Sequence, residues 1–106
     1  MDKLLNFLGL CRRAGKLLTG NDVVTDAVRN GEARLVIVSS DVSKNTEKKL
    51  RAVCGSYSVE ILKLNRTTDE LSASIGKFAA VAATTDSGFA KKLSTLIMND
   101  IGGTCV

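Results

Sequence analysis

The sequence of 106 residues contains no histidine and no proline. Histidine is the residue most often used as a general base, as the activator of a nucleophile and as a metal ligand near neutral pH. Its absence weighs against a catalytic function. The 11 carboxylates are scattered along the chain and form no recognisable catalytic pair. We therefore predict that the chain is not an enzyme and that it needs no cofactor.

Cysteine is also scarce. Cys11, Cys54 and Cys105 are odd in number, widely spaced and without any C-x-x-C pair. This spacing favours neither a disulfide framework nor a zinc site. Cys11 and Cys54 are predicted to be small residues of the core.

Long apolar runs are missing as well. No stretch approaches the ~20 apolar residues that cross a bilayer. The leucine-rich start is interrupted by Asn6 and Gly9, and Arg12 and Arg13 follow it without the small-residue cleavage pattern of a secretory signal. The hydrophobic fraction of 44% is typical of globular proteins. We expect one domain over residues 1–106, cytoplasmic and not bound to a membrane.

The positive charge is concentrated in the first two thirds of the chain. Residues 1–66 contain 12 lysines and arginines against 7 carboxylates, whereas residues 67–106 contain 3 against 4. A basic half is typical of proteins that bind nucleic acid. A solvated surface explains a charge of this size equally well.

The stretch from Gly15 to Asp41 contains the most informative pattern. A short extended piece at 16–19 turns at Gly20 into a helix predicted over 21–30, and an apolar strand is predicted over 34–38. The apolar stripe of this helix comprises Val23, Val24, Ala27 and Val28. The stripe predicts that one face of the helix is buried and that the opposite face is available.

The two ends of this helix are marked by their residue types. Asn21 is predicted to cap the first turn with its side-chain oxygen, and Gly31 is predicted to end the helix. Because a helix N-terminus carries free N–H groups and a partial positive charge, Gly20 and Asn21 are candidate phosphate ligands. Many helices with such a start bind nothing. A nucleotide-binding P-loop is excluded, because Lys16 is followed by two leucines and an extended piece rather than by Ser or Thr and a helix.

The remaining segments alternate between helix and strand. We predict helices over 2–14, from within 41–45 to 57, over 67–76 and from residue 87, with strands over 58–64 and 78–84. The third helix is expected to bury Leu50, Val53, Cys54 and Tyr57. Thr67 and Glu70 have the S/T-x-x-E spacing of a capping box.

This alternation predicts an α/β domain, a three-layer sandwich with a mostly parallel sheet covered by helices on both faces. Loops at 19–22, 39–41, 65–68 and 76–78 are the candidate functional loops. They lie close together only if the strands are ordered suitably.

Several motifs in the chain are specific for one family. They are RRAGK-x-x-TG at 12–20, AVRNGEARLV at 27–36, SSD-x-S-x-N-T at 39–46, L-x-x-x-IGK at 71–77 and TDSGFA at 85–90. With these motifs the chain resembles the YlxQ branch of the L-seven-Ae ribosomal protein family over residues 4–93. The resemblance implies an α/β/α sandwich around a four-stranded mixed sheet.

The resemblance also implies a monomeric RNA-binding protein. Family members bind kink-turn RNA, a sharply bent internal loop with sheared G·A pairs, through the start of the second helix and nearby loops, and ribosomal RNA is one expected partner. Carried over by position, the RNA-binding residues are Lys16, Gly20, Asn21, Asp22, Val23, Asp26, Ser40, Asp41, Asn65, Arg66, Gly76, Lys77 and Phe78.

The chain departs from the family pattern within this region. Where many relatives have lysine, asparagine, glutamate and lysine, this sequence has Thr19, Asp22, Val23 and Asp26. Two carboxylates there would oppose phosphate. A second function therefore stays open, a protein-interaction module on the same scaffold, because relatives of the Gadd type act through protein partners.

Overall fold

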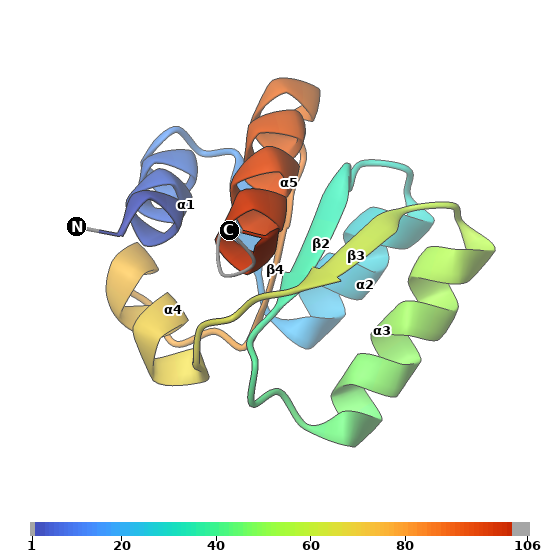
Figure 1. Ribbon diagram of the computed structural model, residues 1–106. Helices are drawn as coiled ribbons and strands as arrows, with labels where there is room; N and C mark the ends of the chain where they lie inside the picture. Colours follow the sequence, from blue (N-terminus) through green and yellow to red (C-terminus); the bar gives the residue numbers. More distant parts are fainter. Residues whose placement is uncertain (1, 103–106) are drawn as a thin grey trace.

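The computed structural model describes residues 2–102 and contains five helices and four strands (Figure 1). The helices are α1 (Lys3–Arg13), α2 (Asn21–Arg29), α3 (Lys44–Ser56), α4 (Thr68–Ile75) and α5 (Ser87–Gly102). The strands are β1 (Leu17–Thr19), β2 (Leu35–Val38), β3 (Glu60–Lys63) and β4 (Val81–Thr84). This order confirms the predicted alternation of helices and strands.

The strands form one mixed sheet in the order β1-β4-β2-β3. β2 and β3 are parallel, whereas β4 is antiparallel to both of its neighbours. The expectation of a mostly parallel sheet was therefore wrong, and the mixed sheet implied by the family resemblance is confirmed. β4 fills the space between β1 and β2, which point the same way, and it runs opposite to both. The alternation of elements cannot reveal this reversal, because it carries no information about strand direction.

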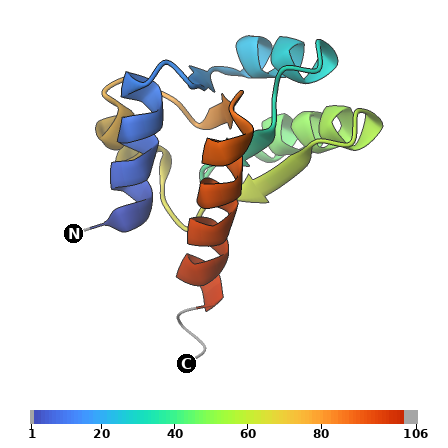
Figure 2. The same cartoon turned by 90° about the horizontal axis from the view of Figure 1, so that it is seen from above.

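Helices cover both faces of the sheet (Figure 2). α1, α4 and α5 pack on one face, and α2 and α3 pack on the other. Successive β2 residues alternate between these layers, so that Leu35 and Ile37 join the first core and Val36 and Val38 join the second. Burial on both sides explains why the strand is apolar at every position.

The start of α2 differs from the prediction in two ways. Gly20, with φ of 100°, occupies the N-cap position, and Asn21 is the first helical residue. The predicted Asn21 cap was therefore wrong. Val24, Ala27 and Val28 are buried, but Val23 is 49% exposed. The reason is that Val23 belongs to the first turn, at the edge of the domain, whereas the other three face the sheet.

The C-terminus of α3 also corrects a prediction. Leu50 and Cys54 are buried as expected, but Tyr57 is 50% exposed. The helix ends at Ser56, so Tyr57 is the C-cap residue and no longer belongs to the buried stripe. Ser58 after it has a φ of 56° and turns the chain away from the helix.

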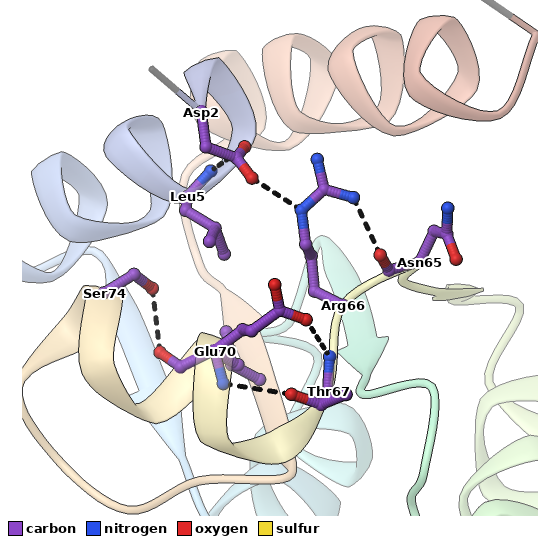
Figure 3. Close-up of polar contacts among 8 residues, drawn as sticks. Asp2, Leu5, Asn65, Arg66, Thr67, Glu70 and Ser74 are labelled. Atoms are coloured by element: carbon purple, nitrogen blue, oxygen red, sulfur yellow. Dashed lines mark hydrogen bonds and ion pairs between the residues drawn. The ribbon is translucent and has the colours of Figure 1, made fainter. Parts of the chain in front are cut away.

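The capping box of α4 is confirmed (Figure 3). The Glu70 N–H donates to Thr67 Oγ1 at 3.2 Å, and the Thr67 N–H donates to Glu70 Oε1 at 2.9 Å. Two first-turn groups are thereby satisfied reciprocally. Gly76 ends the helix in the left-handed conformation, with a φ of 73°.

α1 and α4 approach each other most closely at Gly9. A Cβ atom added at Gly9 would lie 2.8 Å from the Ser74 carbonyl oxygen, a distance that forces the backbone to shift. Gly55 in α3 provides a contrast, since a Cβ there would meet no heavy atom within 4 Å.

We predict opposite effects of alanine at these two helical glycines. Gly9→Ala should lower the free energy of unfolding by about 1–3 kcal/mol, because the overpacking outweighs the gain in helix propensity. Gly55→Ala should leave it unchanged or raise it by up to ~1 kcal/mol. Urea unfolding followed by circular dichroism measures both. Equal stabilities of Gly9→Ala and wild type would contradict the close approach of Gly9 in α1 to the Ser74 carbonyl in α4.

Candidate nucleic-acid interface

The N-terminal end of β4 brings three loops together. The Gly20 N–H donates to the Val81 carbonyl oxygen at 3.1 Å, and the Ser39 N–H donates to the Ala80 carbonyl oxygen at 2.9 Å. The β1–α2 and β2–α3 loops therefore flank the α4–β4 loop, which leads directly into these acceptors. All three lie at the lower edge of the domain in Figure 1.

The β3–α4 loop adjoins the same edge. The Leu64 N–H donates to the Val38 carbonyl oxygen at 2.8 Å, and the Ser40 N–H donates to the Arg66 carbonyl oxygen at 2.8 Å. The pairing of β2 with β3 thus continues past the ends of both strands. The structure therefore gathers the loops at 19–22, 39–41, 65–68 and 76–78 along one edge, an arrangement that depends on the strand order.

The first turn of α2 has no side-chain cap. Of the five helices within residues 2–102, the other four begin with a side-chain oxygen that accepts a backbone N–H; these caps are Asp2, Ser43, Thr67 and Asp86. α2 begins at Gly20, which has no side chain to do so. Asn21, Asp22 and Val23 are exposed around this turn. Its amides and the positive end of the helix dipole are thus available to an anion.

The α4–β4 loop, which leads to the Val81 carbonyl that accepts the Gly20 N–H, presents an aromatic ring and a cation. Phe78 is 78% exposed, and Lys77 and Gly76 are exposed next to it. The end of the loop is fixed, because the Ala79 N–H donates to Ser72 Oγ at 2.9 Å. An exposed ring on a fixed loop offers a face on which a base can stack.

Asp41 ties the β2–α3 loop to the start of α4, where the β3–α4 loop ends. Its Oδ1 accepts from the Thr68 N–H at 2.8 Å and from Thr68 Oγ1 at 2.7 Å. The buried Ser39 hydroxyl is 2.8 Å from the same Thr68 hydroxyl. The hydrogen bonds from Thr68 lower the pKa of Asp41. Ser39 and Thr68 belong to the predicted loops at 39–41 and 65–68, but neither is among the RNA-binding residues carried over from the family.

Arg66 is held on the α1 side of its loop rather than directed outward (Figure 3). Its Nε donates to Asp2 Oδ2 at 2.6 Å, and one terminal nitrogen donates to the Asn65 carbonyl oxygen at 2.7 Å. The Arg66 side chain is 16% exposed. Its hydrogen bond lowers the pKa of Asp2, which also caps α1. Asn65 is exposed, whereas the guanidinium of Arg66 ties the loop to α1.

Lys16 lies at the opposite end of β1 from Gly20. The Thr85 N–H donates to the Lys16 carbonyl oxygen at 3.3 Å, whereas Thr19 pairs with Ala82. The three residues of β1 separate Lys16 from Gly20, a distance of roughly 13 Å along an extended strand. Lys16, one of the RNA-binding residues carried over from the family, therefore lies at the other end of β1 from the first turn of α2.

The edge that carries these four loops, called the loop edge below, has mixed charges. Lys77 contributes a cation, whereas Asp22 and Asp26 are exposed carboxylates of α2. Within residues 2–102, no group of three or more His, Cys, Asp or Glu side chains could hold a metal ion. In the same range, no helix has the length and apolarity needed to span a bilayer.

Comparison with known proteins gives matches over most of the chain. The sequence profile of the ribosomal protein L7Ae/L30e/S12e/Gadd45 family matches residues 2–94. The RNA-binding protein YlxQ of Enterococcus faecium is 40% identical over 95 residues, which are 90% of this chain and 91% of that protein. The RNA-binding protein YlxQ of Bacillus subtilis strain 168 is 44% identical over 91 residues, 85% of this chain and 90% of its own.

A solved structure is also close. A protein of unknown function from Bacillus halodurans superposes with a TM-score of 0.87 at 42% identity, covering 92% of this chain and 99% of its own. The comparisons confirm the resemblance to YlxQ proteins. The two curated relatives are named as RNA-binding proteins and not as enzymes, in agreement with the prediction from the missing histidine.

The Asp41 bonds predict a pH-dependent contribution to stability. The pKa of Asp41 in the folded chain lies below its ordinary value of 3.8. The contribution is therefore complete above about pH 5, and it is lost as the pH falls through the folded pKa, because the unfolded chain takes up the proton first. The difference in unfolding free energy between wild type and Asp41→Ala should be constant from pH 7 to about pH 5 and should shrink below pH 4.

Asp69→Ala is the matched control for this measurement. It removes a carboxylate close to Thr68, in the first turn of α4, that accepts no hydrogen bond from Thr68. Urea unfolding across the pH range compares the two variants. If the stability difference between wild type and Asp41→Ala stays constant down to pH 3, Thr68 does not lower the pKa of Asp41 as described.

Proposed function

The chain belongs to the ribosomal protein L7Ae/L30e/S12e/Gadd45 family, and from this membership we propose that it binds structured RNA of the kink-turn type. The contact surface is the loop edge, formed by the β1–α2, β2–α3, β3–α4 and α4–β4 loops. The observation that supports this best is the exposed, uncapped first turn of α2, which is tied through Gly20 to Val81 at the end of the loop that carries Lys77 and Phe78. A ribosomal RNA is one source of such a partner.

The chemistry of the loop edge suits a bent RNA. A sharp bend crowds phosphates together, and the free amides after Gly20, together with Lys77, can neutralise some of that charge. Asn21 and Asp22 can reach base edges in the opened groove, Asp22 as an acceptor from a guanine edge. Phe78 can stack on a base that has left the helix.

A protein partner is favoured by one feature of the same surface. Val23 is 49% exposed and lies between the exposed carboxylates of Asp22 and Asp26. Val23 offers no hydrogen bond to a base, and both carboxylates repel phosphate. Salt separates the two functions, because phosphate contacts weaken steeply with ionic strength and an apolar protein contact does not.

The direct test is a titration of two RNAs that differ only in the bend. We expect a kink-turn RNA to bind more tightly than a matched duplex whose G·A pairs are replaced by Watson–Crick pairs. Affinity for the kink-turn should fall steeply between ~50 and ~200 mM salt. A kink-turn taken from ribosomal RNA tests the ribosomal source in the same assay. Equal, salt-insensitive affinities would contradict the proposal and favour the protein partner.

Two lysines toward opposite ends of the β1–β4 strand pair provide the control for this titration. Lys77→Gln should weaken binding and reduce the salt slope by about 1, as expected for one lost phosphate contact. Lys16→Gln makes the same chemical change at the far end of β1 and should have little effect. Equal losses for both variants would show that charge, rather than the loop edge, drives binding.

Phe78 provides a second test. Phe78→Ala should cost about 1–3 kcal/mol of RNA binding, roughly 5- to 150-fold in affinity, through lost base stacking. The stability of the domain should change little, because the ring is 78% exposed. Tyr57→Ala is the control, since Tyr57 is an exposed aromatic residue at the C-terminal end of α3. Unchanged RNA affinity of Phe78→Ala would exclude stacking.

A further inference from the structure

A groove of ≈ 490 Å³ lies between α2 and α3. It is lined by Asn21, Asp22, Thr25 and Arg29 of α2 and by Asn45, Thr46, Lys49, Leu50, Ala52 and Val53 of α3. Residues from the first turns of both helices line it, so it opens at the same edge as the proposed RNA contact. Figures 1 and 2 both show the two helices side by side.

The walls of this groove carry two exposed cations. Lys49 lies in the second turn of α3, and Arg29 is the last residue of α2. Leu50 on the floor is almost completely buried. Asn21 and Asn45 supply polar groups at the mouth. A strand that enters at the mouth would therefore meet Asn21, Asn45 and the carboxylate of Asp22 first, and then a cation on each wall.

The charge balance of α3 favours an anionic occupant. The helix contains four cations and the single carboxylate Glu47. Glu47 is already paired, with Arg51 at 2.8 Å and with Lys63 at 3.2 Å, and these hydrogen bonds lower its pKa. The charge of Glu47 is therefore balanced by Arg51 and Lys63, neither of which lines the groove. Asp22 at the mouth is the one carboxylate among the residues that line the groove, against the two cations on its walls.

We propose that the α2–α3 groove holds the phosphate backbone of the RNA helix that leaves the bend, with Arg29 and Lys49 as its phosphate contacts. This inference rests on the proposed function, because it extends the footprint of the same RNA from the loop edge along the groove. The acidic residues Asp22 and Asp26 make the start of α2 a poor source of positive charge, and the groove supplies that charge further along. Phosphate contacts of this kind add affinity without reading sequence.

The experiment varies the length of the RNA arm. Two RNAs share one kink-turn, and one has its flanking helix trimmed to the closing pairs while the other keeps a long arm. The full chain should bind the long-arm RNA more tightly and with a steeper salt dependence. Arg29→Gln and Lys49→Gln should each reduce the long-arm salt slope by about 1. Both should leave affinity for the trimmed RNA unchanged. Lys91→Gln changes an exposed residue of α5, in the other helix layer, and should alter neither the long-arm salt slope nor the affinity for the trimmed RNA.

The outcomes separate the groove from the loop edge. If wild type binds the trimmed RNA and gains nothing from the long arm, the groove proposal fails and the proposed function stands. If the arm adds affinity that Arg29→Gln/Lys49→Gln does not reduce, the arm lies elsewhere and the groove proposal also fails. If wild type binds neither RNA, both fail. Thermal unfolding of each variant, expected to match wild type because both side chains are exposed, shows that a lost contact is not lost folding.

Discussion

The loop edge depends on two carbonyl groups at the start of β4. The Ala80 and Val81 oxygens accept the N–H groups of Ser39 and Gly20, so one short segment sets the position of both neighbouring loops. This is possible because β4 is central and antiparallel to both β1 and β2, whose C-terminal ends therefore meet its N-terminal end. A shift of β4 by one residue would move Ala82 into the second core and Val81 and Ala83 into the first.

The edge has one rigid side and one open side. On the β2–β3 side, Asp41 and Ser39 are bonded to Thr68, and the guanidinium of Arg66 is bonded to Asp2, so these polar groups mainly hold the protein together. On the β1–β4 side, backbone amides and exposed side chains face outward. Rigid support beneath an open contact surface reduces the ordering cost of binding.

Local features of this fold were predictable, and distant contacts were not. The capping box of α4 depends on residues three apart, so the sequence alone identified it. The bond from Arg66 to Asp2 joins residues 64 apart, and no local pattern reveals it. The exposure of Tyr57 depends on a backbone turn at Ser58 that helical periodicity does not contain.

The strand order also has a consequence for synthesis of the chain. Within residues 2–102, β1 pairs with β4 alone, and β4 is the last strand to be made. A nascent chain can pair β2 with β3 early, but Leu17–Thr19 has no strand partner until Val81–Thr84 has emerged. At about 5–20 residues per second, the amphipathic α1 and the start of α2 therefore wait several seconds before their final neighbours exist.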